Sequence, residues 1–170
     1  MESTAMDEEE LEEFLIPEEA YEKLSDPSVI RRYIEEGKTF QEIIGYSQES
    51  MDVFYLQARK LYMKGLYEKA NSAFLFLTTL NPFVPGYWVG MGLCEQMRED
   101  YHAALAAYGM ASLSDDRDPY PHYYSAICYY YLNERDNARH SMELAQEYIS
   151  DRDDLLDLKQ SILSAKERIY

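Results

Sequence analysis

The side chains that most often carry out covalent or metal chemistry show no productive spacing in this chain. His102, His122 and His140 lack the spacing of metal ligands, and no glycine-rich phosphate-binding loop is present. Acidic pairs such as Glu35–Glu36 and Asp115–Asp116 fall in predicted loops or helix ends, where carboxylates are usually solvated. No catalytic residue, metal site or cofactor is therefore predicted, and the chain is expected not to be an enzyme.

The two cysteines, Cys94 and Cys128, stand 34 positions apart. If that distance is one structural repeat, their Cα atoms lie about one helix spacing apart, roughly 8–10 Å. A disulfide requires a Cα separation below about 7 Å. Both are therefore predicted to be small, buried apolar residues, and a redox or metal-binding pair is the alternative.

Non-covalent recognition is the chemistry that the composition favours. The chain has 17 tyrosines and 8 methionines among 170 residues. Tyrosine gives a large, rigid contact area with a polar tip, and methionine adapts to varied partners. Whether these side chains meet on one surface depends on the elements that carry them.

Those elements repeat every 34 residues, in the windows 51–84, 85–118 and 119–152. Equivalent positions carry small residues twice and a large residue once in each window: Ala58, Gly92 and Ala126; Ala70, Ala104 and Ala138; Phe74, Tyr108 and Met142. This period and pattern are typical of tetratricopeptide repeats. Small residues allow two helices to approach, and large residues fill the space between stacked helices. The predicted fold is all-α, with three tandem tetratricopeptide-repeat hairpins.

The predicted repeat region is 47–150, with hairpin helices at 48–64 and 67–80, 85–98 and 101–113, and 120–133 and 135–149. A C-terminal capping helix is predicted within 151–170. Its apolar positions step by three and four residues, at Leu155, Leu158, Ile162, Ala165 and Ile169. One apolar and one polar face suit the end of a stacked array.

Two segments precede the repeats. Residues 1–26 are acidic and are predicted to be partly disordered, with a short helix opened by Pro17 as the alternative. Residues 27–46 are predicted to form helices, because Asp26-Pro27 and the capping box Thr39–Glu42 are helix-start signals. The first of these helices carries one apolar face, formed by Val29, Ile30, Tyr33 and Ile34. That face must pack on the first repeat or on another subunit.

The first helices of a tetratricopeptide array line a concave groove. The residues predicted to bind a peptide there are Tyr55, Arg59, Tyr62, Met63, Val89, Leu93, Gln96, Met97, Tyr120, Tyr123, Ile127 and Tyr130. A contiguous apolar surface of this kind indicates a binding site, and burial of part of the stripe in the core is the alternative. Positions that hold Lys and Asn in carboxylate-clamp grooves carry other residues here, so an extended apolar peptide is the predicted ligand.

The charge balance excludes several partners. The formal net charge is −16 and the sequence pI is about 4.5, so direct nucleic-acid binding is not expected and anionic membranes are disfavoured. No export signal or apolar run of about 20 residues is present. No stable membrane insertion is predicted, and a cytoplasmic location is expected.

Several motifs resemble those of one bacterial family. They are Leu61-Tyr62-x-x-Gly65-x-Tyr67-x-x-Ala70, Phe74-x-x-Leu77, Tyr87-Trp88-x-Gly90-x-Gly92-x-Cys94-x-Gln96, Tyr101-x-x-Ala104, Tyr108-x-x-Ala111, Asp118-Pro119 and Cys128-Tyr129. Over about residues 37–150 the pattern resembles the class II chaperones of type III secretion, the LcrH/SycD-type chaperones of translocator proteins. The run from Trp88 to Gln96 is its most specific part.

This resemblance implies a chaperone in the bacterial cytoplasm that binds hydrophobic translocator proteins before secretion. It implies a groove for an extended Pro-x-Leu-x-x-Pro-like segment, and a homodimer with Val29, Ile30, Tyr33 and Ile34 at the contact. It also implies, in some members, a transcription activator or secretion-apparatus component as a further partner. Arg59 departs from the pattern, since an aromatic residue is common there. The alternative function is a tetratricopeptide-repeat scaffold or regulatory adaptor in a stable complex.

Overall fold

The computed structural model describes residues 18–150 and 152–170, and every regular element in these ranges is an α-helix. Three helices come first: α2 (Glu18–Ser25), α3 (Pro27–Glu35) and α4 (Phe40–Ile44). The predictions made for residues 1–17, including a helix start at Pro17, lie outside the described residues. Residues 18–25, which belong to the predicted acidic segment, are helical.

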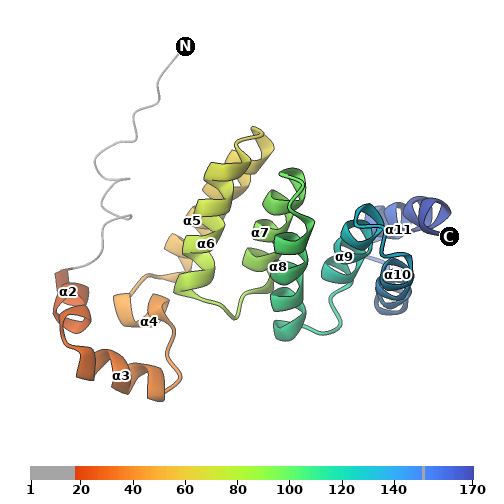
Figure 1. Ribbon diagram of the computed structural model, residues 1–170. Helices are drawn as coiled ribbons and strands as arrows, with labels where there is room; N and C mark the ends of the chain where they lie inside the picture. Colours follow the sequence, from red (N-terminus) through yellow and green to blue (C-terminus); the bar gives the residue numbers. More distant parts are fainter. Residues whose placement is uncertain (1–17, 151) are drawn as a thin grey trace, which may run out of the picture.

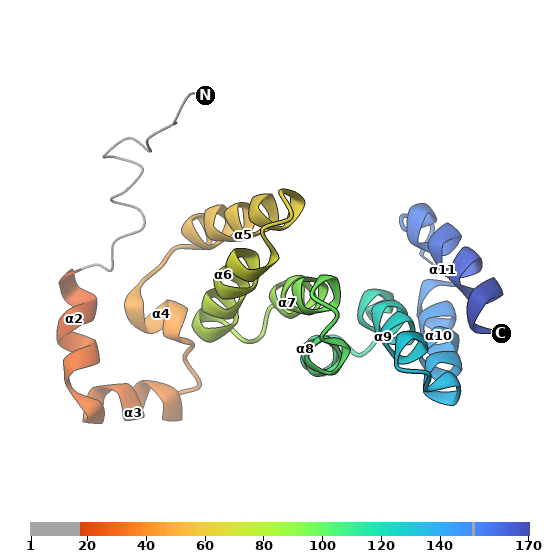
Figure 2. The same ribbon diagram turned by 45° about the horizontal axis from the view of Figure 1, so that its top comes forward.

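Three helical hairpins follow, and a last helix closes the chain. The hairpins are α5 (Gln48–Met63) with α6 (Tyr67–Leu80), α7 (Pro85–Met97) with α8 (Tyr101–Ser114), and α9 (Pro119–Tyr131) with α10 (Arg135–Ile149). Helix α11 (Leu156–Ile169) packs on α9 and α10. The hairpins stand side by side in a row, with α2–α4 at one end and α11 at the other (Figures 1 and 2). The predicted fold class is confirmed.

Local sequence explains where most of these helices begin. Thr39 accepts a hydrogen bond from the backbone N–H of Glu42, and the Glu42 carboxylate accepts one from Thr39 N–H at 2.8 Å, so the predicted capping box is present. The side chains of Ser47 and Asp100 cap α5 and α8 by accepting a hydrogen bond from the backbone N–H of Ser50 and of Ala103, respectively. These caps satisfy N–H groups that have no partner inside the helix.

The turns inside the three hairpins share one unusual backbone conformation. Gly65, Glu99 and Asn133, which are one repeat apart, have φ values of 74°, 63° and 61°. At each turn the following residue donates a backbone hydrogen bond to the carbonyl five residues before it, from Leu66 to Leu61, Asp100 to Glu95 and Glu134 to Tyr129, at 2.9–3.1 Å. This Schellman arrangement ends the first helix of each hairpin, and it requires one residue with a left-handed backbone conformation.

Replacement of Glu99 by Gly should therefore stabilise the protein. A left-handed conformation costs a residue with a Cβ about 1–2 kcal/mol, and the greater freedom of Gly in the unfolded chain removes about 0.4–1 kcal/mol of that gain. We expect Glu99→Gly to raise the free energy of unfolding by about 0.5–1 kcal/mol, measured by urea denaturation. Gly65→Ala is the control and should change it in the opposite direction. A loss of stability in Glu99→Gly would contradict this account.

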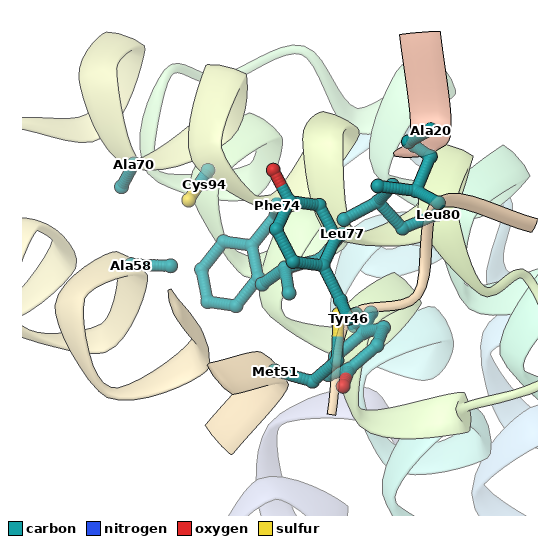
Figure 3. Close-up of a cluster of buried hydrophobic side chains, with 11 residues drawn as sticks. Ala20, Tyr46, Met51, Ala58, Ala70, Phe74, Leu77, Leu80 and Cys94 are labelled. Carbon is teal, nitrogen blue, oxygen red and sulfur yellow. The ribbon is translucent and has the colours of Figure 1, made fainter. Parts of the chain in front are cut away.

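The buried side chains form three clusters along the row. The first surrounds Phe74 and Leu77 and extends from Ala20 of α2 to Cys94 of α7, which lie on opposite sides of it in Figure 3. The second consists of Ala104, Tyr108 and Cys128. The third lies between α9, α10 and α11 and contains the following residues: Ala126, Ala138, Met142, Ala145, Ile149, Leu158, Ile162 and Ile169.

Two glycines explain why α7 can lie close to both of its neighbours. A Cβ at Gly90 would clash with the ring of Phe74 on α6, and a Cβ at Gly92 would clash with the ring of Tyr108 on α8. Both rings are buried. Cys94, on the same helix, is a free and fully buried thiol, as is Cys128, and burial raises the pKa of each to about 12. The prediction of small, buried cysteines is confirmed.

Candidate peptide-binding groove

The first helices of the hairpins, α5, α7 and α9, together line a groove with a volume of about 560 Å³. Seven of the residues predicted to bind a peptide are in its wall: Tyr55, Arg59, Tyr62, Met63, Val89, Leu93 and Tyr120. Gly86 lies beside them. The wall also contains Phe74, Gly90, Asp118 and Tyr124, which the sequence did not point out as groove residues. Phe74 and Tyr124 pack in the buried clusters and also line the groove.

Ring contacts hold the tyrosines of the groove in place. The ring of Tyr55 meets Phe74 edge to face with centroids 6.0 Å apart, and it packs at a tilt on Tyr87 at 5.6 Å. The ring of Tyr62 packs on Tyr67 at 5.4 Å. Such aromatic pairs stabilise a geometry beyond the burial of their area. The groove is therefore largely formed before any ligand binds.

Two charged residues lie in this apolar wall. The guanidinium of Arg59 stands 5.8 Å from the ring centre of Tyr55, in a cation–π contact. Asp118 caps α9 by accepting a hydrogen bond from Tyr120 N–H at 3.0 Å. Burial raises the pKa of Asp118, and the neighbouring carboxylate of Asp115 adds to that effect. The groove thus offers an extended apolar surface with one cation and one carboxylate.

The predicted residues of the third repeat line a different pocket. Tyr123, Ile127 and Tyr130 form one wall of a pocket of about 630 Å³, together with Tyr131, and α11 forms the opposite wall. The contribution of α11 is Asp157, Gln160, Ser161, Ser164, Ala165, Arg168 and Ile169. The sequence assigned α11 a capping role alone. The polar face of α11 was predicted, but nothing in the sequence indicated that this face lines a pocket with α9.

Gln96 and Met97 lie outside both pockets. The half-buried Gln96 side chain points between repeats, where its Oε1 accepts hydrogen bonds from the Tyr108 hydroxyl at 2.9 Å and from the Cys128 thiol at 3.5 Å. Gln96 therefore links α7 to α8 and α9. Met97, at the end of α7, is 47% exposed.

Replacement of Gln96 by Ala should accordingly lower stability. The fully buried Tyr108 hydroxyl would lose its acceptor, and an unsatisfied buried polar group costs about 1–3 kcal/mol. We expect urea denaturation to show a loss of this size. The double variant Gln96→Ala/Tyr108→Phe should recover part of it, because no hydroxyl is then left unpaired. Unchanged stability in Gln96→Ala would show that the hydrogen bond contributes nothing.

The stack of hairpins with an apolar groove along its first helices defines a protein of the tetratricopeptide-repeat class. No family model matches the chain. Over 137 residues the chain is 26% identical to the low calcium response locus protein H of Yersinia pestis, covering 81% of this chain and 82% of that protein. It is 26% identical to the chaperone protein SicA of Salmonella dublin, covering 69% and 72%.

Two solved structures agree with these relatives. A chain of a CopN–Scc3 complex is 35% identical, with a TM-score of 0.69 and coverage of 75% of both chains. The type III secretion chaperone SycD of Yersinia enterocolitica, solved with a peptide of the translocator YopD, is 27% identical, with a TM-score of 0.68 and coverage of 72% and 94%. The chain belongs to the LcrH/SycD-type family of type III secretion chaperones, which is not a family of enzymes. No helix in the described residues is long and apolar enough to cross a bilayer.

Proposed function

We propose that this chaperone binds an extended apolar segment of a hydrophobic translocator in the groove between α5, α7 and α9, and keeps that client unaggregated in the cytoplasm until secretion. The observation that carries the proposal is the 560 Å³ groove itself, with tyrosine, valine and leucine side chains from three helices in one wall. The SycD structure with a YopD peptide supports it by analogy.

The groove residues suit a ligand in extended conformation. Rigid aromatic walls and a preformed shape reduce the entropy lost on binding, and a Pro-x-Leu-x-x-Pro-like segment is itself conformationally restricted. Leu93 and Val89 offer apolar contact to a client leucine, while the rings of Tyr55 and Tyr62 can pack against prolines. Arg59 would meet a client carboxylate or pack through its aliphatic stem.

Co-expression tests the proposal directly. A translocator encoded near this chaperone should be recovered from the soluble fraction when the wild-type chaperone is present, and should aggregate when the chaperone carries Tyr62→Ala and Leu93→Ala together. The client should leave the complex once secretion proceeds. A client that aggregates equally with both forms would reject the proposal, and a client that stays bound through secretion would favour the scaffold alternative.

We further propose that the chaperone is a homodimer with α3 at the contact. No residue of α3 (27–35) is buried, and Ile34, on its apolar face, is 53% exposed. Helices α2–α4 lie at the end of the row of hairpins in both views (Figures 1 and 2), so a second subunit suits this face better than the first repeat does. A transcription activator or secretion-apparatus component as a further partner stays a prediction from the family resemblance.

The variant Ile34→Asp should convert the dimer to monomer. Burial of an isoleucine at an interface contributes about 1.5–3 kcal/mol, and the substitution affects both copies, so the dimer dissociation constant should rise by at least about tenfold. Multi-angle light scattering over a dilution series measures this. The control Arg31→Asp places the same charge at another exposed position of α3. An oligomeric state that does not change in Ile34→Asp would locate the contact elsewhere.

A further inference from the structure

The pocket between α9 and α11 has two chemically different walls. Helix α9 contributes Tyr123, Ile127 and Tyr130, which form an apolar and aromatic surface. Helix α11 contributes hydroxyl, amide and guanidinium groups: Gln160, Ser161, Ser164 and Arg168. Both walls are accessible, because Tyr130 and the four polar residues of α11 are exposed. A ligand here would therefore place an apolar side chain on one wall and a hydrogen-bonding or anionic group on the other.

Arg168 gives this pocket a local positive charge in a chain with 32 acidic and 16 basic residues. Within the described residues Arg168 forms no ion pair. Asp157 lines the same pocket, but it lies 11 residues earlier on α11, which is about 16 Å along a helix axis. Arg168 and Ser161 both act on the Tyr123 hydroxyl: burial raises the pKa of Tyr123, and these two neighbours oppose the rise.

An aromatic ridge on α9 connects this pocket with the groove. Tyr120 lines the groove and Tyr123 lines the α9–α11 pocket, and the ring of Tyr124 contacts both, with centroids 6.3 Å and 5.2 Å away. The two hollows are neighbours across α9. A helix with its side chains is about 10–12 Å wide, so the groove and the α9–α11 pocket, on two sides of α9, are separated by roughly 10–20 Å. An extended chain covers that distance with about 3–6 residues.

We propose that the α9–α11 pocket is a second anchor site for the same client segment, and that it takes an apolar side chain adjacent to an Asp or Glu. The apolar side chain packs on Tyr123 and Ile127. The neighbouring carboxylate accepts hydrogen bonds from Arg168 and from the hydroxyls of Ser161 and Ser164, which is the pairing that guanidinium and hydroxyl groups favour. This inference rests on the proposed function, because it requires that the groove holds the first part of the segment.

Fluorescence anisotropy with designed peptides tests this inference on the full-length protein. The core probe is a labelled Pro-Ala-Leu-Ala-Ala-Pro peptide. Longer probes add a Gly/Ser spacer of about four residues and then Leu-Glu or Leu-Gln, at either end of the core. We expect one Leu-Glu probe to bind about tenfold more tightly than the core, since a buried leucine is added. We expect it to bind about threefold to fivefold more tightly than its Leu-Gln counterpart at low salt, the size of an exposed ion pair.

Arg168→Gln should remove the preference for Leu-Glu over Leu-Gln and leave the affinity for the core unchanged. Arg135→Gln is the matched control, because it removes the same charge from an exposed position of α10 outside both pockets, and it should keep the preference. If the core binds but neither extension strengthens binding, the second anchor site is rejected while the groove stands. Equal binding of the two longer probes, or a preference that survives Arg168→Gln, would overturn the role of Arg168. A core that does not bind would reject the groove and the second site together.

Discussion

Leu93→Ala should weaken binding of a Pro-x-Leu-x-x-Pro-like peptide by about tenfold or more, equivalent to about 1.4 kcal/mol, with little change in thermal stability. Leu93 lines the groove together with Val89 on its own helix and the tyrosines of α5 and α9, and its side chain is half-buried. A few well-packed residues at the centre of an interface usually contribute most of the binding energy. Leu93 has the position of such a residue.

Two measurements on each variant separate binding from folding. Anisotropy titration gives the affinity, and circular dichroism at 222 nm gives the melting temperature. Leu113→Ala is the matched control, because Leu113 is 81% exposed on α8 and lines neither pocket, so neither quantity should change. If Leu93→Ala loses folding together with binding, the leucine is a core residue. If neither changes, the groove is not the peptide site.

Ile162→Ala should cost about 2–5 kcal/mol of stability, the usual loss for a buried isoleucine truncated to alanine. Ile162 is 2% exposed in the cluster between α9, α10 and α11, where Met142 and Leu158 also lie. The next residue on α11, Leu163, is 62% exposed. Leu163→Ala is therefore the control and should change stability by less than about 0.5 kcal/mol.

Urea denaturation followed by circular dichroism measures the difference between these two variants. A similar loss in both would mean that Leu163 packs against the hairpins as well as Ile162. A loss in neither would mean that α11 does not contribute to the folded unit at all, and the second anchor site proposed above would then have no outer wall.

The helices could be predicted closely because their signals are local and repeated. Close helix packing requires small residues at fixed positions, here Ala58, Gly92 and Ala126. The capping box marks the start of a helix by its own hydrogen bonds, here between Thr39 and Glu42. The left-handed turn at Glu99 had no such signal. The two helices that it joins impose the positive φ on Glu99, although this conformation is unfavourable for a glutamate.

The candidate site could be predicted only in part, because groove position depends on the direction of each side chain as well as on its place in the repeat. The repeat pattern gives Gln96 a groove-facing position. Its side chain instead lies between the repeats, because it accepts a hydrogen bond from the buried hydroxyl of Tyr108. Phe74 belongs to a second helix, and it reaches the groove because Gly90 leaves room for its ring. The pocket between α9 and α11 could not be predicted from the sequence, because it exists only where α11 packs beside α9.

The division of the interior into three clusters has a consequence for how a client could be released. The groove crosses the boundaries between them, since α5 and α7 belong to the first cluster while α9 joins the second and third. Local opening between the first two hairpins would widen the groove and divide the first cluster, and opening between the last two hairpins would divide the second cluster, so each opening exposes buried side chains. A bound client contacts helices on both sides of these boundaries and opposes their separation. It should therefore slow amide hydrogen exchange throughout the row of hairpins. Force applied to the client at one end could then open the row one hairpin at a time, and a secretion machine would not need to unfold the chaperone to empty it.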